Sequence, residues 1–288
     1  MLITKQCMCV DAALAKNPKM IIGVAKPVAP SKIYACLKNI HFVVSDNNHQ
    51  MRLFHSVGVK TIQLKLVEEF PTGVVHRPRP AFSAEKPAVL CYHGNANHFL
   101  SLVHDHFMLL NAASLGVPFV VVAVVSPEEV RRMRTNALKT NITILIQPYN
   151  PHNVFHKLRD CDVGLVPQFR AGLRDQSSAC VHDDCQSIDT TVRYKLTANA
   201  GRAYVFMQLG VPIIADSVTE VAEVVGYNSL GILLDSAEHA VWLEAVRMVV
   251  SDFCVRKYLA DRSRQYATRF LRPSVEAMKL RDYVTQFV

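Results

Sequence analysis

The chain has few charged residues and no long hydrophobic run. Of its 288 residues, 19% are charged and 50% are hydrophobic, which excludes a mostly disordered, collagenous or coiled-coil chain. The most apolar run, residues 116–125, is too short to span a membrane as a helix. Lys5 followed by Asp11 is a poor match to a signal peptide. We therefore expect a cytoplasmic protein, in solution or peripheral at a membrane surface.

The sequence also lacks a disulfide framework. Its 8 cysteines lie mostly inside apolar runs, where buried free thiols are usual. Cys180, His182 and Cys185 stand close together and are potential zinc ligands, with Cys161 as a conceivable fourth. Their spacing completes no four-ligand pattern, and polar loops often collect such residues. Metal binding there stays open, but we predict a metal-independent protein without a cofactor.

An excess of acidic residues is absent as well. The chain has 32 basic and 24 acidic side chains, a net charge of +8, and its partner is therefore expected to be anionic. The charge is uneven: residues 1–87 carry +7, residues 88–250 carry −3 and residues 251–288 carry +4. A nucleic-acid binder would interleave basic and exposed aromatic residues along one element. The sequence has no such element, and we expect no nucleic-acid partner.

From residue 88 onward, short β-branched runs alternate with helical patterns. The runs are nearly continuous in apolar residues, which is typical of strands covered on both faces. Strands are expected at 88–92, 118–124, 142–146, 163–166, 212–215 and 231–234. Helices are expected at 99–115, 127–137, 152–161, 192–209 and 218–225. Gly116, Gly210 and Gly226 follow three of these helices as C-terminal caps. The alternation predicts an α/β domain with a six-stranded, doubly wound parallel sheet.

The residues before 88 predict a smaller α/β lobe. Its strands are expected at 20–25, 41–45 and 60–67, and its helices at 11–16, 31–37 and 48–57. The proline-rich stretch 68–87 has no period and predicts a linker. After residue 251 the chain is helical, with an interruption at Pro273. The expected domains are a small N-terminal lobe at 1–72, a linker at 73–87, a Rossmann-like domain at 88–250 and C-terminal helices at 251–288, which pack back on the small lobe.

Two groups of residues suit an anionic ligand. Ligands of open parallel sheets bind at the carboxyl ends of the strands. After the first strand of the larger domain, the turn at Gly94 and Asn95 would offer free backbone N–H groups to a phosphate, unless it is an ordinary strand-to-helix turn. Lys195, Asn199 and Arg202 share one face if they are helical. The two cations could neutralise a diphosphate, or they could form a solvated basic face.

Acidic residues at strand ends have two interpretations. Asp216 and Glu220 follow the strand at 212–215, where a carboxylate could accept hydrogen bonds from ribose or could cap a helix. The triplet 160–162, Asp-Cys-Asp, is similar to the acidic metal-binding triplet of some sugar transferases. It lies where a helix ends and a strand begins, and we interpret it as a structural boundary. The polar loop 168–191 is long enough for a binding or lid element.

Residues 88–250 resemble the nucleotide-sugar-binding half of GT-B-fold glycosyltransferases. The resemblance rests on ordered segments: the glycine turn at 89–95, Leu-Gly-Val-Pro at 115–118, Gln-Pro-Tyr-Asn at 147–150, Asp-Val-Gly-Leu-Val-Pro at 162–167 and Gly-Val-Pro-Ile-Ile-Ala at 210–215. It implies two Rossmann-like lobes, the N-terminal one reduced. It also implies that a nucleoside-diphosphate sugar is the co-substrate and that its sugar is transferred to an acceptor hydroxyl.

The resemblance also implies roles for individual residues. It assigns Lys195 and Arg202 to the donor diphosphate and places Gly94 and Asn95 beside the phosphates. It places Asn199 and Glu220 near the ribose or the sugar. Val205 stands where many retaining members have a second glutamate, so retaining chemistry by the usual residues is not expected.

An inverting reaction needs a general base on the acceptor side. Asp46 and His49 follow a strand of the small lobe and are the candidates, although Asp46 could instead cap a helix. Glu68 and Glu69 are weaker ones. The positive charge outside residues 88–250 predicts an anionic saccharide or lipid-linked acceptor, or peripheral contact with an anionic membrane.

Two other functions stay open. The small first lobe and the missing glutamate also suit a non-catalytic nucleotide- or sugar-binding subunit of a larger complex, and a homo-oligomer or a partner subunit could complete that lobe. A nucleotide-sugar epimerase is the other alternative, with His93, His182 and Asp183 as its polar groups.

Overall fold

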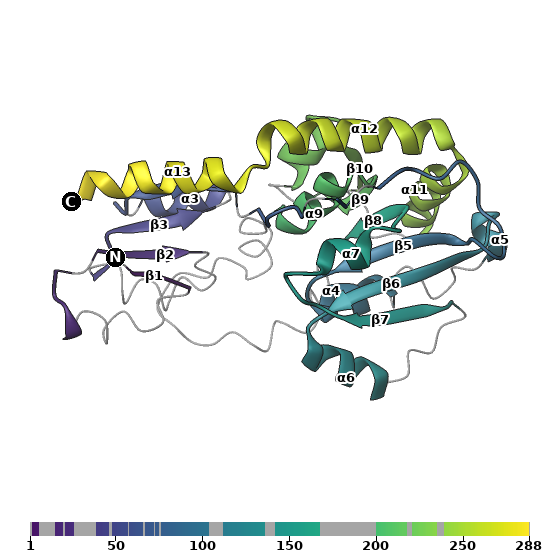
Figure 1. Ribbon diagram of the computed structural model, residues 1–288, viewed down its shortest axis with the longest axis horizontal. Helices are drawn as coiled ribbons and strands as arrows, with labels where there is room; N and C mark the ends of the chain where they lie inside the picture. Colours follow the sequence, from purple (N-terminus) through teal and green to yellow (C-terminus); the bar gives the residue numbers. More distant parts are fainter. Residues whose placement is uncertain are drawn as a thin grey trace. The chain divides into compact units, whose positions relative to one another are not determined.

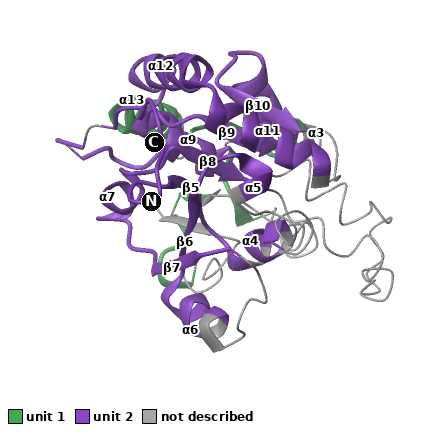
Figure 2. Ribbon diagram, turned by 90° about the vertical axis from the view of Figure 1, so that its right-hand side faces the viewer, with its two compact units in different colours: residues 1–66, 176–199, 272–288 green, residues 67–175, 200–271 purple. Residues whose placement is uncertain are grey.

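The chain forms two compact units. The computed structural model describes residues 2–5, 15–19, 21–25, 39–45, 48–56, 58–65, 67–71, 73–74, 76–103, 112–135, 142–167, 200–217, 221–234 and 239–287. Unit 1 comprises residues 1–66, 176–199 and 272–288, and unit 2 comprises residues 67–175 and 200–271 (Figure 2).

Unit 2 contains a parallel sheet whose described strands number six (Figure 1). They are β5 (Ala88–His93), β6 (Phe119–Val125), β7 (Ile144–Pro148), β8 (Val163–Val166), β9 (Ile213–Asp216) and β10 (Gly231–Leu234). The order is β10-β9-β8-β5-β6-β7, and every neighbouring pair is parallel. The predicted doubly wound sheet is confirmed. Its order reverses between β5 and β8, and this is the switch point at which such sheets bind ligands.

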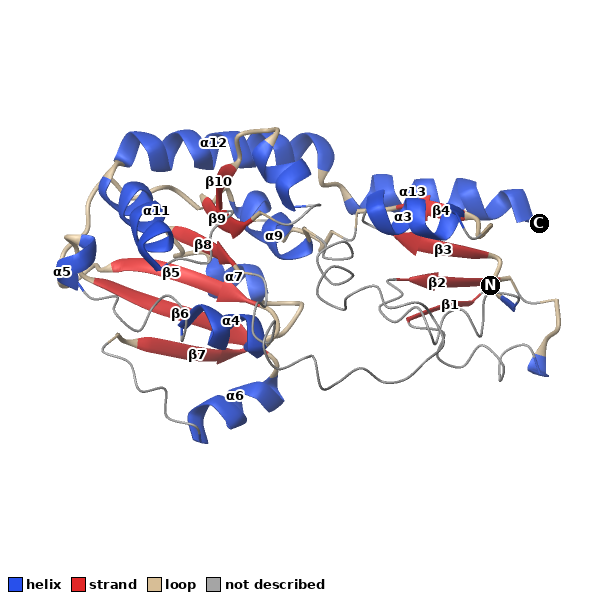
Figure 3. Ribbon diagram, turned by 180° about the vertical axis from the view of Figure 1, so that it is seen from behind, coloured by secondary structure: helices blue, strands red, loops and turns tan. Residues whose placement is uncertain are grey.

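Helices connect and cover these strands, as Figure 3 shows in blue. They are α4 (Ala96–Leu102), α5 (Ala112–Leu115), α6 (Pro127–Thr135), α7 (Val154–Leu158), α9 (Gly201–Leu209), the π-helical turn η4 (Ala222–Gly226), α11 (His239–Ser251) and α12 (Phe253–Phe270). The main core lies between the sheet and α11, where Trp242, the protein's one tryptophan, is fully buried.

Two of the three predicted glycine caps are confirmed. Gly116 and Gly210 have φ values of 73° and 74° and follow α5 and α9. Gly226 is a correction, because it ends η4 without a positive φ, and the chain turns instead at Ser229 with a φ of 53°. A Cβ on Gly226 would lie 2.7 Å from Cδ1 of Leu233. Close packing, not backbone conformation, therefore explains this glycine.

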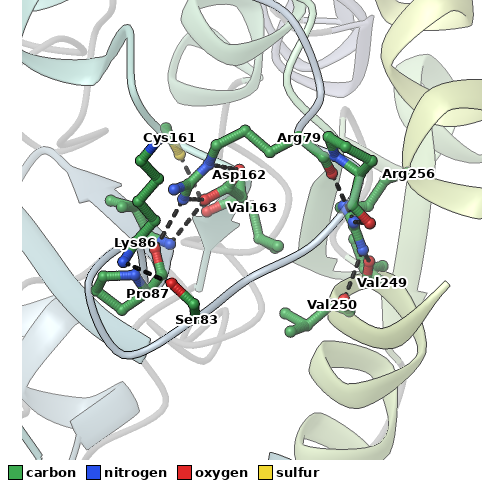
Figure 4. Close-up of polar contacts among 12 residues, drawn as sticks. Arg79, Ser83, Lys86, Pro87, Cys161, Asp162, Val163, Val249, Val250 and Arg256 are labelled. Atoms are coloured by element: carbon green, nitrogen blue, oxygen red, sulfur yellow. Dashed lines mark hydrogen bonds and ion pairs between the residues drawn. The ribbon is translucent and has the colours of Figure 1, made fainter. Parts of the chain in front are cut away.

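The described residues of the stretch 67–87 contain no helix or strand, and this stretch belongs to unit 2. Arg79 forms an ion pair with the carboxylate of Asp162, whose side chain is 1% exposed (Figure 4). Asp162 also accepts a hydrogen bond from the Val89 N–H at 2.8 Å. The buried Arg256 donates to the carbonyls of Arg79 and Pro80. Asp162 is thus a structural residue at the start of β8, as predicted.

Unit 1 contains a parallel sheet in the order β1-β2-β3-β4 among its described residues. The elements are β1 (Leu2–Lys5), β2 (Ile22–Ala25), β3 (Phe42–Ser45), α3 (Asn48–Ser56), β4 (Thr61–Gln63), α13 (Pro273–Val284) and a final 3-10 turn, η5 (Thr285–Phe287). The sequence predicted β2, β3 and β4 but not β1, which lies at Leu2–Lys5. The helices expected at 11–16 and 31–37 lie largely or wholly outside the described residues.

The final helix α13 packs on the sheet of unit 1 (Figure 3). Tyr283 meets Phe42 edge to face, with ring centroids 5.5 Å apart. The buried Glu276 accepts a hydrogen bond from the Lys65 N–H at 3.0 Å. Because α12 belongs to unit 2, the C-terminal helices divide between the two units at Leu271. The described helices include none that is long and apolar enough to cross a membrane.

Candidate functional site

Arg202 lies at the switch point of the unit 2 sheet. It stands in the first turn of α9, and its Nη1 donates hydrogen bonds to the Pro167 carbonyl, just after β8, at 2.8 Å and to the Tyr92 hydroxyl, on β5, at 3.4 Å. Its guanidinium carbon lies 5.9 Å from the centre of the Tyr92 ring. Within the described part of the chain, Nε and Nη2 of Arg202 have no hydrogen-bond partner. This edge of the guanidinium can therefore bind an anion.

Gly94 makes room for this arginine. Its φ is 126°, a conformation that side chains rarely adopt, and an added Cβ would lie 2.9 Å from Cδ of Arg202 and 3.1 Å from the Tyr92 hydroxyl oxygen. The glycine thus lets the Arg202 side chain cross the end of β5. Asn95, which follows it, is exposed.

Two backbone N–H groups of this turn, those of Gly94 and Ala96, already have acceptors within unit 2. The Gly94 N–H donates to the Val124 carbonyl at 3.0 Å. The Ala96 N–H donates to Oε1 of Glu129 at 3.1 Å. The other carboxylate oxygen of Glu129 accepts from the Ser126 hydroxyl, and this pair caps the start of α6. A carboxylate thus already occupies the start of α4, and Arg202 is the group here that can attract an anion.

Two histidines next to Arg202 are uncharged at neutral pH. Nε2 of His93 lies 3.0 Å from the Arg202 carbonyl oxygen, and the neutral tautomer with a proton on Nε2 donates a hydrogen bond to this oxygen. Burial lowers the pKa of His93 to about 4, and the positive charge of Arg202 lowers it further. Burial and the same charge lower the pKa of His98 to about 3. The positive charge of this cluster therefore belongs to Arg202.

The buried His93 is expected to make unit 2 less stable in acid. Below pH 6.5 the unfolded chain binds a proton at this position, whereas the folded chain does not until pH 4 is approached. His93 alone should therefore lower the free energy of unfolding by about 1.4 kcal/mol per pH unit across this range and have no effect above it, and His98 should add to the fall. Urea unfolding at a series of pH values, followed by the fluorescence of the buried Trp242, measures this. The His93→Gln variant should show a shallower fall, and an equal slope in both proteins would contradict the prediction.

Most other predicted site residues cannot be placed. Lys195, Asn199, Glu220 and Asp46 lie outside the described residues, as does the segment with Cys180, His182, Asp183 and Cys185. His49 lies in the first turn of α3, but its side chain is not described. The structure thus brings together Gly94, Asn95 and Arg202. No group of three histidine, cysteine or acidic side chains suited to a metal occurs among the described residues.

The acidic candidates near the linker and after β9 differ in their surroundings. The carboxylate of Glu68 accepts a hydrogen bond from the Tyr149 hydroxyl at 2.6 Å, and the Glu68 carbonyl accepts one from Gln208. Glu69 is exposed. Asp216, the last residue of β9, is buried. Glu68 is therefore already used within unit 2.

Tyr92 and Pro167 also belong to this site, although no motif in the sequence marks them. Tyr92 lies in a continuous apolar strand and is fully buried, so its sequence context is that of a core residue. Their place in the chain could have indicated them, since Tyr92 and Pro167 lie at the ends of the first and fourth strands of a Rossmann-like order. Those ends meet at the switch point.

These features define the fold. Two units, each built on a parallel sheet, with the larger one in Rossmann order, have the fold of GT-B glycosyltransferases. The resemblance predicted for residues 88–250 is thus confirmed at the level of the fold, and it extends over nearly the whole chain.

Three solved structures illustrate the similarity. Sucrose-phosphate synthase from Thermosynechococcus elongatus matches 99% of this chain and is covered to 72%, with a TM-score of 0.65 and 12% identity. HepE from Anabaena, in complex with UDP-glucose, matches 96% and is covered to 75%, with a TM-score of 0.66 and 9% identity. TarM from S. aureus, in a complex that includes UDP, matches 93%, with a TM-score of 0.60 and 8% identity, and this chain spans 50% of its length. No protein-family model and no curated protein sequence matches the chain.

Proposed function

We propose that the protein is a glycosyltransferase that moves a sugar from a nucleoside-diphosphate sugar to an acceptor hydroxyl. The observation that carries this proposal is Arg202 at the switch point, with Nε and Nη2 unpaired within the described residues. A planar guanidinium matches two oxygens of a phosphate or diphosphate. The structures of HepE with UDP-glucose and of TarM with UDP support a ligand of this class.

The proposed reaction needs positive charge at the leaving group. When the bond between sugar and diphosphate breaks, negative charge develops on the diphosphate, and Arg202 and Lys195 would stabilise it electrostatically. Gly94 and Asn95 would lie beside the phosphates, and Asn199 and Glu220 would contact the ribose or the sugar. Because two cations neutralise the diphosphate in this scheme, the reaction would proceed without a metal.

The acceptor side is assigned to the N-terminal lobe. In an inverting reaction, Asp46 or His49 would accept the proton of the attacking hydroxyl. Both follow β3, at the carboxyl end of the unit 1 sheet, which is the end where open parallel sheets bind ligands. We keep residues 1–72 as the acceptor-side lobe, 73–87 as the linker, 88–250 as the donor domain and 251–288 as the C-terminal helices.

The excess positive charge belongs to unit 1. Its residues include 14 basic and 7 acidic side chains, a net charge of +7, whereas unit 2 has 18 and 17, a net charge of +1. We therefore propose an anionic saccharide or lipid-linked acceptor, reached at an anionic membrane surface. Sedimentation with anionic and with neutral vesicles tests the membrane contact. Binding only to anionic vesicles, weakened by salt, is expected, and association that salt does not change would contradict it.

Release of nucleotide from a panel of UDP-, GDP- and ADP-sugars tests the activity. We expect the wild-type protein to release nucleoside diphosphate from one donor class, faster with acceptor, and the Arg202→Ala variant to release little. Tight binding without turnover would favour the non-catalytic subunit instead. Conversion of the donor to an isomeric nucleotide sugar would favour the epimerase, and absence of binding to every donor would contradict the proposal.

A further inference from the structure

The Tyr92 hydroxyl connects the turn after β5 to Arg202 of α9. The hydroxyl donates a hydrogen bond to the Asn95 carbonyl at 2.5 Å and accepts one from Nη1 of Arg202 at 3.4 Å. The ring is fully buried and stacks on Phe99, with centroids 5.3 Å apart and planes inclined by 29°. A buried and stacked ring holds its hydroxyl in one place. The oxygen that contacts Arg202 is therefore a fixed point of the unit 2 core.

Arg202 is held at one end of its guanidinium. Nη1 lies between the Pro167 carbonyl, at the end of β8, and the Tyr92 hydroxyl, on β5. The aliphatic part of the side chain passes over Gly94, where a Cβ would lie 2.9 Å from Cδ. These contacts restrict the rotamers of a long side chain before any ligand arrives. An arginine ordered in advance loses less entropy when it binds an anion.

We propose that Tyr92 is a positioning residue that aims Nε and Nη2 of Arg202 at the diphosphate of the donor. This inference rests on the proposed function and adds a residue to it. The same hydroxyl fixes the turn at Gly94 and Asn95 through the Asn95 carbonyl. The effect of Tyr92 on nucleotide binding is exerted through Arg202, so a nucleoside diphosphate depends on it more than a nucleoside monophosphate does.

The hydroxyl can be removed with little other change. The Tyr92→Phe variant keeps the buried ring and its stack on Phe99 and loses the described hydrogen bonds to the Asn95 carbonyl and from Arg202. Loss of one ordinary hydrogen bond corresponds to a change in Kd of about 2- to 13-fold. We expect the Kd for the nucleoside diphosphate to rise about 5-fold and the Kd for the monophosphate to rise less.

A double-mutant cycle separates positioning from a general loss of structure. Calorimetric titration with UDP, GDP and ADP first identifies the nucleotide that the wild-type protein binds. The same titration is then made for Tyr92→Phe, for Arg202→Ala and for the double variant. Because the hydroxyl is proposed to act through Arg202, Tyr92→Phe should not weaken binding further when Arg202 is already alanine. Tyr204→Phe, a buried tyrosine on α9, is the matched control and should bind as the wild type does.

The nucleotide affinities decide between a positioning role and a structural one. An unchanged Kd in Tyr92→Phe would overturn the inference, and so would an equal loss of affinity in both backgrounds, because that marks a structural role. If Tyr92→Phe lowers the affinity only in the protein that keeps Arg202, and not in the Arg202→Ala variant, the result supports the positioning role. Failure of the wild-type protein to bind any of the three nucleotides would overturn the proposed function together with this inference. Normal binding by the wild type and by Tyr92→Phe would overturn this inference alone.

Discussion

Replacing Asp162 with alanine is expected to lower the free energy of unfolding of unit 2 by about 2–3 kcal/mol. The Asp162 carboxylate is buried, and it accepts hydrogen bonds from the Arg79 guanidinium and from the Val89 N–H. Alanine would leave the guanidinium with its hydrogen bond to the Pro87 carbonyl but without a carboxylate, and it would remove the acceptor of the N–H. Because the Arg79 side chain is 31% exposed, water can solvate part of it, which keeps the loss below that of a fully buried pair.

Urea unfolding followed by tryptophan fluorescence measures this loss. Trp242 is buried in the core of unit 2, so its signal reports the unfolding of that unit. Asp160→Ala is the matched control, since Asp160 is an exposed carboxylate two residues away, and its removal should change stability by less than about 0.5 kcal/mol. Equal midpoints for the two variants would show that the Arg79–Asp162 pair does not hold the linker in place.

Replacing Arg202 with alanine should weaken the binding of nucleoside diphosphate about 30- to 150-fold. Charged hydrogen bonds to a phosphate oxygen contribute about 2–3 kcal/mol, and the neutral His93 and His98 cannot replace the lost charge. The variant should stay folded, because Arg202 is only partly buried and its described side-chain hydrogen bonds are made by Nη1 alone.

Calorimetric titration compares this variant with Arg159→Ala. Arg159 is exposed on the surface after α7 and faces Asp160 at 3.5 Å, so its removal should leave the affinity unchanged. Lys195→Ala should weaken binding in the same direction as Arg202→Ala. If Arg202→Ala and Arg159→Ala bind the nucleotide equally well, the switch point is not the diphosphate site.

The strands of unit 2 could be predicted because their signal is local. Each is a short run of mostly apolar residues, rich in β-branched ones in β6 and β8, and such runs alternate with helical periods, which predicts a parallel sheet without further information. The caps at Gly116 and Gly210 are also local, because the residue after a helix must turn. Gly226 shows the limit of that signal, since this position has no room for a side chain beside Leu233 of β10.

The candidate site was predictable only in part. Arg202 was proposed from its spacing and from the resemblance, and Gly94 from its place after a strand, and the structure brings these two residues into contact. The partner of the Ala96 N–H was not predictable, because Glu129 is 33 residues away and belongs to α6. Tyr92 could not be separated from its apolar neighbours, since its role depends on Arg202, 110 residues further along the chain.

The sequence by itself determined the class of fold and the low charge density, because both depend on composition and on patterns among near neighbours. Scarcity of charge and the lack of a long apolar run already excluded a disordered or coiled-coil chain. Only the tertiary structure decided which polar groups have hydrogen-bond or ion-pair partners within the protein. Arg79 and Asp162 meet across 83 residues, Arg256 reaches the linker across 177 residues, and α12 and α13 belong to different units. Such contacts leave no local pattern, since each is made only after distant segments have packed together.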